Sequence, residues 1–209
     1  MMRILVLGAR GHARPVIEAL RAMRAEVAGL LDDSPRGAVL GVPVLGSFAE
    51  LGRLRREGLE QAVIAIGHNP TRERLGALCR AAGFALLPVL HPTALVSPSA
   101  RIGEGAQVMA RAVIGPEATI GALALVNTGA IVEHECVVGP AAHLGPGAVL
   151  CGGVRVGARA LLAAGAVVRA RHLDRRGRHG RAGRRPGRRR AGRGAAGRGP
   201  GQAVLRIRY

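Results

Sequence analysis

Aromatic side chains are almost missing from this sequence, whose 209 residues include no Trp, one Tyr and two Phe. A core without large rings must be filled by Val, Ile, Leu and Ala, and an apolar share of 48% supplies enough of them for a sizeable core. Small aliphatic side chains pack well in flat, regular layers. The composition therefore favours a repetitive architecture over an irregular globule.

Lysine is absent as well, so all 31 basic residues behind the formal net charge of +18 are Arg. Residues 169–209 hold 15 of these Arg against one acidic residue, Asp174, which gives this tail a net charge of +14. Subtracting +14 from +18 leaves +4 for residues 1–168. The nearly balanced body argues against a nucleic-acid surface, and no aromatic residues alternate with the tail arginines to stack on bases.

The tail at 169–209 consists mainly of Arg, Gly, Ala and Pro and has no periodicity. Such a segment cannot bury enough apolar surface to fold alone, so a disordered tail is predicted. A second interpretation is that the tail is a shifted reading frame of a GC-rich gene, which would yield the same residue types and agrees with the absence of Lys.

Cysteines are few and far apart in this chain. Cys79, Cys136 and Cys151 have neither the spacing of a zinc site nor that of a disulfide framework, and a cytoplasmic location is expected. No signal peptide is expected, because the N-terminal apolar run ends at Gly8 and leads into a structured motif. No stretch reaches the roughly 20 consecutive apolar residues of a membrane span.

A six-residue repeat runs through the second half of the chain. In steps of six from Val96 to Val168, every position holds Val, Ile or Leu, and the residue four positions after each is small in nearly every case. A helix would have a period of 3.6 and an ordinary strand a period of 2. The thirteen aliphatic positions are Val96, Ile102, Val108, Ile114, Ile120, Val126, Val132, Val138, Leu144, Leu150, Val156, Leu162 and Val168.

This repeat is typical of short strands joined by tight corners. The aliphatic residue would fill the interior, the small residue would let the corner close, and the Gly that often follows the aliphatic is expected to relieve backbone strain at the bend. Three segments would make one triangular coil, and successive coils would stack as parallel strands about 4.8 Å apart. The sequence therefore predicts a parallel β-helix over 89–168.

Strands alternate with helices in the first 88 residues, which is typical of an α/β layer with a parallel sheet. The chain is thus predicted to consist of an α/β domain at 1–88, a β-helix at 89–168 and the tail at 169–209. Strands are predicted at 3–7, 26–31, 61–66 and 84–87, and helices at 13–25, 47–57 and 71–82.

His134 is the strongest candidate for chemistry within the repeats. Val132 and Cys136 occupy inward positions, so His134 is expected at a corner and pointing outward. Its neighbours Glu133 and Glu135 suit a general base, because a nearby carboxylate stabilises the imidazolium. A solvated surface histidine is the alternative. A groove beside it is also indicated, because Gly152 follows one full coil later and should stack against the ring.

His143 occupies another outward position half a coil after His134. The coil histidines include no close pair, and His91 lies only near the entry, so no zinc site is expected.

The turn after the first strand could bind an anion. Gly8, Gly11 and His12 lie between a strand and a helix, where backbone N–H groups can hold a phosphate. The motif is shorter than the full dinucleotide-binding pattern, and a plain strand-to-helix turn is equally open. Asp32 and Asp33, at the end of the second strand, could accept hydrogen bonds from sugar hydroxyls or form a surface turn.

Six segments together resemble the sialic acid O-acetyltransferase family of hexapeptide-repeat sugar acetyltransferases, whose relatives N-acetylate UDP-4-amino-sugars. The resemblance spans about residues 3–168 and is most specific around His134. The segments are ILVLGARGHARPVIEAL, LDD, AIGHNPTRERL, HPTALVSPSA, VNTGAIVEHECVVGPAAHLGPGAVLCGGVRVG and LLAAGAVV.

The resemblance implies a Rossmann-like N-terminal domain that binds a nucleotide-sugar, and a left-handed β-helix that binds acetyl-CoA. It also implies a homotrimer with the active site between subunits and an acceptor of the UDP-amino-sugar or sialic acid type. No metal is expected, because of the spacing of the histidines. By position, His134 would be the general base and Glu135 the residue that raises its basicity. The remaining implied contacts are His143, Gly152 and Ala164 for acetyl-CoA, and Arg10, Gly11, His12, Asp32 and Asp33 for the nucleotide-sugar.

Direct acetyl transfer to an amine or hydroxyl is the predicted mechanism, with no covalent acyl-enzyme, because Cys136 is expected to point inward. Two other functions remain open at this point. One is a catalytically inactive β-helix that serves as a scaffold or binds a sugar nucleotide, and the other is nucleic-acid binding through the tail.

Overall fold

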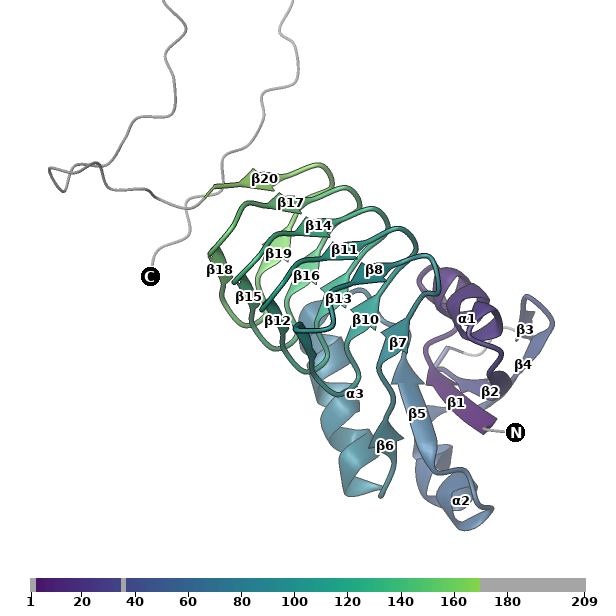
Figure 1. Cartoon of the computed structure of the whole chain (residues 1–209). Coiled ribbons are helices and arrows are strands. Elements are labelled where there is room, and N and C mark those ends of the chain that lie inside the picture. Colours follow the sequence, from purple (N-terminus) through teal and green to yellow (C-terminus); the bar gives the residue numbers. More distant parts are fainter. Residues whose placement is uncertain (1–2, 35–36, 170–209) are drawn as a thin grey trace, which may run out of the picture.

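The computed structural model describes residues 3–34 and 37–169. They form an α/β layer that leads directly into a parallel β-helix (Figure 1). The predicted fold class, an α/β N-terminal part followed by a left-handed β-helix, is confirmed. The prediction of a disordered or frame-shifted tail concerns residues 170–209, which lie outside the described residues.

The α/β layer contains a six-stranded sheet with helices on both faces. Its elements are β1 (Arg3–Leu7), α1 (Ala13–Ala22), β2 (Glu26–Leu31), β3 (Ala38–Val39), β4 (Val42–Gly46), the 3-10 helix η1 (Phe48–Glu50), α2 (Leu51–Arg56), β5 (Gln61–Ile64), α3 (Asn69–Ala81) and β6 (Ala85–Leu86). The strand order is β3-β4-β2-β1-β5-β6, and only the β3–β4 pair is antiparallel. Because side chains alternate along β1, Ile4 and Val6 pack with α1, whereas Leu5 and Leu7 pack with α2 and α3.

The layer differs from the sequence prediction at several boundaries and in one additional hairpin. Strand β5 ends at Ile64 and not at residue 66, and α3 begins at Asn69 and not at residue 71. Helix α1 ends at Ala22 and not at residue 25, because the chain turns at Arg24 with a left-handed φ of 58°. The β3–β4 hairpin was not predicted at all. Its two-residue turn places Leu40 and Gly41 at φ values of 49° and 78°, which is the geometry of tight hairpins, but leucine gives no turn signal in a sequence.

The β-helix is a triangular prism with three sheets as its faces. Its strands are β7 (Val89–Leu90), β8 (Leu95–Val96), β9 (Arg101–Ile102), β10 (Gln107–Val108), β11 (Val113–Ile114), β12 (Thr119–Ile120), β13 (Leu125–Val126), β14 (Ile131–Val132), β15 (Val137–Val138), β16 (His143–Leu144), β17 (Val149–Leu150), β18 (Arg155–Val156), β19 (Leu161–Leu162) and β20 (Val167–Val168). We call β7-β10-β13-β16-β19 the first face, β8-β11-β14-β17-β20 the second and β9-β12-β15-β18 the third. Partners lie 18 residues apart, as Leu125 and His143 do.

The interior of the prism is filled as the repeat predicts. Aliphatic side chains such as Val108 and Ile114 alternate there with small ones such as Ala112, and all three are at most 1% exposed. The same cluster extends from Ala106 to Leu162, so one continuous apolar column holds the coils together.

The glycines that follow the aliphatic residues have a different purpose from the one predicted. A Cβ atom on Gly115 would lie 2.8 Å from the backbone of Glu133 and His134 in the next coil. Such glycines therefore permit close stacking, and the expectation that they relieve strain at the bend was wrong. The left-handed corner residues fall elsewhere, once every six positions, at Gly105, Arg111, Glu117, Leu123, Gly129, Glu135, Ala141, Gly147, Gly153, Arg159 and Gly165.

A fully buried arginine joins the α/β layer to the coils. Arg72, in α3, donates from Nε to the carbonyl oxygen of Leu123 and from Nη2 to that of Ala141, both at 2.8 Å. Its Nη1 donates to the carbonyl oxygens of Ile66 and Gly67 in its own layer. Carbonyl oxygens thus solvate the guanidinium and fix the layer against the first face, whose outward side is buried from β7 to β13.

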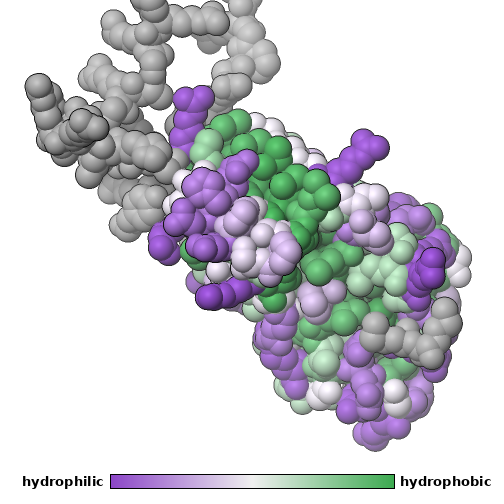
Figure 2. All heavy atoms as spheres, in the orientation of Figure 1, coloured by the Kyte–Doolittle hydropathy of each residue, from purple (hydrophilic) through white to green (hydrophobic). Residues whose placement is uncertain are grey.

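The second face, by contrast, is apolar and open. Outward side chains at one position of each strand form an aliphatic ladder, and Figure 2 shows hydrophobic surface gathered over these strands. Leu95 is 70% exposed and Val167 is 49% exposed at the two ends of the ladder. The ladder consists of Leu95, Val113, Ile131, Val149 and Val167.

Replacing Arg72 by Met should lower the free energy of unfolding by about 3 kcal/mol or more, because several buried carbonyl oxygens lose their donors. Urea unfolding followed by circular dichroism measures this loss. Arg74→Met is the matched control, because Arg74 is exposed on the same helix, and it should stay within about 0.5 kcal/mol of wild type. Equal losses in the two variants would contradict the role given to Arg72.

Candidate active site

His134 lies exposed at the corner between β14 and β15, as predicted. Its Nδ1 lies 2.9 Å from Oε2 of Glu135. A carboxylate only accepts, so the proton of the neutral ring is on Nδ1 and the lone pair is on Nε2. Glu135 is itself held at the corner, where its φ is 58° and its backbone N–H donates to the carbonyl oxygen of Pro116 at 2.9 Å. This pair has the arrangement of a general base and its orienting carboxylate.

Glycines of the neighbouring coils enclose His134 from both sides. A Cβ atom on Gly152 would lie 2.4 Å from Nε2 of the ring, so only glycine leaves the lone pair room. On the other side, Gly115 lies against the backbone of His134. The imidazole of His134 therefore lies against a glycine of the next coil, which leaves space beside its Nε2.

Cys136, two residues after the base, points into the prism and is fully buried. Its Sγ donates to the carbonyl oxygen of Cys151 at 3.2 Å. Burial raises the pKa of the Cys136 thiol, so it is a poor nucleophile at neutral pH.

A second histidine, His143, lies half-buried where the α/β layer meets the first face. Asn127 fixes its tautomer. Because Oδ1 of Asn127 accepts from the backbone N–H of Thr128 at 2.8 Å, its Nδ2 donates to Nε2 of His143 at 3.3 Å. Burial, helped by the charge of Arg72, lowers the pKa of His143 to about 4, and a hydrogen bond with the backbone of Gly67 opposes the shift. The ring is neutral at physiological pH.

His12 belongs to the same junction and lies at the start of α1. Its Nε2 is 2.9 Å from Oε1 of Gln107, a fully buried residue of β10. Burial lowers the pKa of His12 as well, against the effect of the Gln107 hydrogen bond, and the charge of Arg72 lowers it further. His12, Gln107 and His143 therefore make a neutral polar cluster beside one buried cation.

The loop between β1 and α1 is built around Gly8 and Asp32. Gly8 has a φ of 111°, and a Cβ atom there would lie 2.7 Å from the carbonyl oxygen of Ala65. Asp32, predicted to bind the sugar nucleotide, is only 5% exposed, and its two oxygens accept from the backbone N–H groups of Ala9 and Ser34 at 2.8 and 2.9 Å. The two hydrogen bonds of Asp32 therefore hold the backbone of the loop in place.

Two arginines line a hollow of about 200 Å³ at the start of α1. Arg10 donates from Nη2 to Oγ of Ser34 at 3.1 Å, and Arg14 lines the hollow together with Ala38 and Val39. Asp33, also predicted as a ligand, accepts from the backbone N–H of Phe48 at 3.1 Å. Cationic side chains at a helix N-terminus suit an anion such as a phosphate. The hollow is lined by Ala9, Arg10, Gly11, Arg14, Ala38 and Val39.

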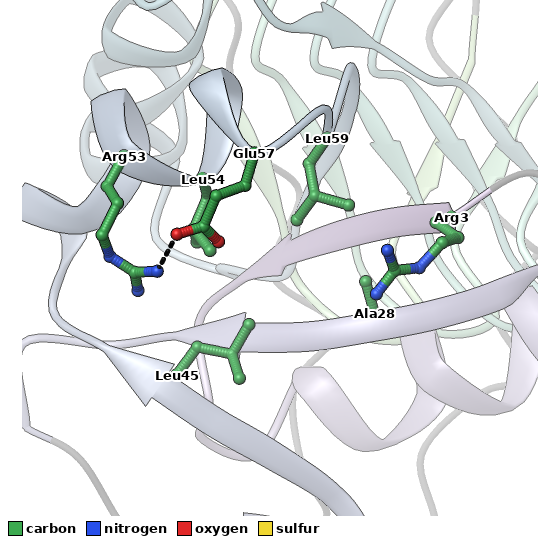
Figure 3. Close-up of a pocket in the computed structure, with 7 residues that line it drawn as sticks. All are labelled: Arg3, Ala28, Leu45, Arg53, Leu54, Glu57 and Leu59. Atoms are coloured by element: carbon green, nitrogen blue, oxygen red, sulfur yellow. Dashed lines mark hydrogen bonds and ion pairs between the residues drawn. The ribbon is translucent and has the colours of Figure 1, made fainter.

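A larger hollow of about 280 Å³ lies between α2 and the sheet and is shown in Figure 3. Arg53 and Glu57 form an ion pair at its rim. None of the predicted site residues lines it, so it is not part of the candidate site. Its lining residues are Arg3, Ala28, Leu45, Arg53, Leu54, Glu57 and Leu59.

The predicted site residues lie on different sides of the prism. His134 and Gly152 are at the corner between the second and third faces, whereas the α/β layer with His12 covers the first face. His143 is on the first face, and Ala164 is at the corner between the first and second faces. A single chain therefore does not bring the base together with the α/β layer.

No group of three or more His, Cys, Asp or Glu side chains within residues 3–34 and 37–169 is arranged to hold a metal ion.

Sequence reasoning missed four residues of the junction: Arg72, Asn69, Asn127 and Gln107. One of them did have a signal. The outward positions of the first face, read in steps of 18 from Val89, place Gln107 before Leu125, so it is a polar residue where the layer buries apolar ones. Arg72 gave no signal, because an arginine in a helix is ordinarily solvated.

Protonation of His143 should weaken the fold in acid. Its pKa is about 4 in the folded chain and near 6.5 when unfolded, so the unfolded chain binds more protons between these values. The free energy of unfolding should therefore fall as pH drops from about 6.5 to about 4. Urea unfolding at pH 7 and pH 5 measures the slope, which should be smaller in His143→Asn. An unchanged slope in that variant would contradict the assignment.

The sequence matches known families in both halves of the chain. Residues 3–77 match the PglD N-terminal domain, and residues 135–170 match the bacterial transferase hexapeptide model of six repeats. Over 117 residues the chain is 34% identical to a UDP-N-acetylbacillosamine N-acetyltransferase of Bacillus subtilis. This similarity covers 53% of the chain, and the chain spans about half (52%) of the length of that curated relative.

Solved structures extend the similarity across both parts. A perosamine N-acetyltransferase from Caulobacter crescentus, a histidine-to-asparagine mutant in complex with CoA and GDP-perosamine, is 49% identical, with a TM-score of 0.79 and coverage of 79% of each chain. The acetyltransferase domain of PglB from Neisseria gonorrhoeae, in complex with acetyl coenzyme A, is 33% identical with a TM-score of 0.72, over 80% of this chain and 90% of that one. Identity at this level over most of both chains means that the protein belongs to the hexapeptide-repeat sugar acetyltransferases with a PglD-type N-terminal domain.

Proposed function

We propose that this protein transfers the acetyl group of acetyl-CoA to the amino group of a nucleotide-linked sugar in the cytoplasm. The observation that carries the proposal is His134, an exposed imidazole whose Nδ1–H is bound to Glu135 and whose Nε2 lone pair is open. The relatives support an amine acceptor over a hydroxyl, because two of the three named above are N-acetyltransferases. No helix of the described part of the chain is long and apolar enough to cross a membrane.

In the proposed reaction, Nε2 of His134 takes a proton from the acceptor amine as its nitrogen attacks the thioester carbonyl. The new C–N bond forms, the C–S bond breaks, and the proton passes from His134 to the departing thiolate. Glu135 stabilises the imidazolium through Nδ1–H while the proton is on the ring. A backbone N–H would stabilise the transient oxyanion.

The nucleotide end of the acceptor would bind at the start of α1. Arg10 and Arg14 supply positive charge beside the loop that contains Gly11, which is what a diphosphate requires. Asp33 is exposed, precedes Ser34, the partner of Arg10, and would meet the sugar or the base, whereas Asp32 would act by holding the loop. The relatives support a nucleoside diphosphate carrier, UDP in one case and GDP in the other.

The acting species would be a homotrimer. The aliphatic ladder of the second face leaves Leu95 and Val167 exposed, and burying such a ladder against a second copy is favourable. The corner that contains His134 borders this face, so a neighbouring copy would bring its own α/β layer, with His12, to the base. Acetyl-CoA would lie along the same boundary and contact His143, Gly152 and Ala164.

Replacing His134 by Ala should reduce transfer at least about 1,000-fold, because the amine proton then has no acceptor. Release of free CoA thiol with UDP- and GDP-linked amino-sugars measures the rate. Glu117→Gln is the control, because Glu117 is an exposed corner residue that corresponds to Glu135 one coil earlier, and its rate should stay within about twofold of wild type. Wild-type turnover by His134→Ala would refute the assignment of His134 as the general base. Binding of CoA without transfer by the wild-type protein would favour a catalytically inactive scaffold.

Replacing Ile131 by Arg should convert the trimer to monomers, because a charge in the middle of the aliphatic ladder resists burial. Sedimentation velocity measures the mass in solution. Thr119→Arg places the same charge at the corresponding position of the third face and should leave the trimer intact. A trimer in both variants would rule out the second face as the contact between copies.

A further inference from the structure

Gln107 is a polar side chain in a position where its strand neighbours bury hydrocarbon. It lies on the outward side of β10, between Val89 and Leu125, and all three are fully buried under the α/β layer. A buried amide is costly unless both of its ends are hydrogen-bonded. Both ends of Gln107 have a partner, one at Ile64 and the other at His12.

The orientation of the Gln107 amide follows from the chemistry of its two partners. Nε2 lies 2.7 Å from the carbonyl oxygen of Ile64, which can only accept, so the NH₂ group must face β5. Oε1 therefore faces His12, at 2.9 Å from its Nε2. An oxygen that only accepts requires a donor, so Nε2 of His12 carries a proton.

The other ring nitrogen of His12 is then fixed as an acceptor. Burial holds the pKa of His12 below its usual value, and the nearby Arg72 cation acts in the same direction, so the ring is neutral at pH 7. A neutral ring protonated at Nε2 has its lone pair on Nδ1. Among the described residues no group hydrogen-bonds to Nδ1 of His12. The lone pair of His143, in contrast, already accepts a hydrogen bond from Asn127.

We propose that Gln107 is a positioning residue that holds His12 in the Nε2–H tautomer, so that Nδ1 accepts a hydrogen bond from an N–H or O–H group of the acceptor sugar. This inference rests on the proposed function and assigns a chemistry within it. His12 recognises a hydrogen-bond donor of the sugar, and the anionic diphosphate is left to Arg10 and Arg14. A ring that presents a lone pair repels a phosphate oxygen.

The first test is spectroscopic and requires no substrate. Long-range ¹H–¹⁵N correlation spectra of the ligand-free protein distinguish a protonated from an unprotonated ring nitrogen, and His12→Asn assigns the signal. Wild type should show His12 protonated at Nε2 only, whereas Gln107→Leu should show a mixture of both tautomers. A proton on Nδ1 in wild type, or an unchanged spectrum in Gln107→Leu, would overturn the inference.

The second test separates positioning from folding. Gln107→Leu should raise the KM for the nucleotide amino-sugar about tenfold, the loss of roughly one hydrogen bond, and leave the KM for acetyl-CoA within twofold. Leu125→Val is the matched packing control, because it disturbs the same buried position one coil later, and both KM values should stay near wild type. Equal changes in both KM values, or none, would overturn the inference.

The two tests also separate this inference from the proposed function. The Nε2–H signature without transfer to any nucleotide sugar would refute the proposed function and the sugar as ligand. Transfer together with an Nδ1–H signature would refute the role of Gln107 alone.

Discussion

The arrangement of this protein depends on one buried guanidinium. Arg72 is fully enclosed, and the groups that contact it are backbone carbonyl oxygens and the side-chain oxygen of Asn69, without a carboxylate in the described structure. Burial lowers its pKa only to about 10, so it keeps its charge. An unpaired cation of this kind is tolerated only while every N–H has an oxygen partner. The α/β layer is therefore held at a single position on the prism.

That position has electrostatic consequences for the histidines. The charge of Arg72 and the loss of water together keep His12 and His143 neutral, and each then has a tautomer set by a neighbouring amide. His134 lies on the opposite side of the prism, exposed, with a carboxylate as its partner. The fold thus keeps two buried, neutral histidines at the junction apart from the exposed histidine that has the features of a base.

The sequence alone was sufficient for the parts of the fold that repeat. The six-residue period predicted the inward positions, the corner of His134 and the stacking of Gly152 on its ring, because each follows from counting along one coil. The contacts at the junction between the α/β layer and the β-helix could not be predicted by counting along the repeat. The contact of Arg72 with Leu123 joins residues 51 apart in sequence through a backbone carbonyl oxygen, and every residue has one. The left-handed turn at Leu40 was likewise invisible, because tertiary context overrode the local preference of leucine.

The register of 18 residues between stacked strands also defines which length changes this architecture tolerates. Inserting or deleting a whole coil on the C-terminal side of Gly152 shifts the later strands along the axis and keeps each residue on its face. A change of six residues keeps the packing inside, since aliphatic still follows aliphatic, yet rotates everything after it by one face of the prism. Such a chain would fold with its core intact, but the outward side chains after the change would lie on a different face from their native one. In this protein the interior packing therefore tolerates length changes in steps of six residues, whereas the outer faces tolerate only steps of 18. Only changes of 18 residues preserve both.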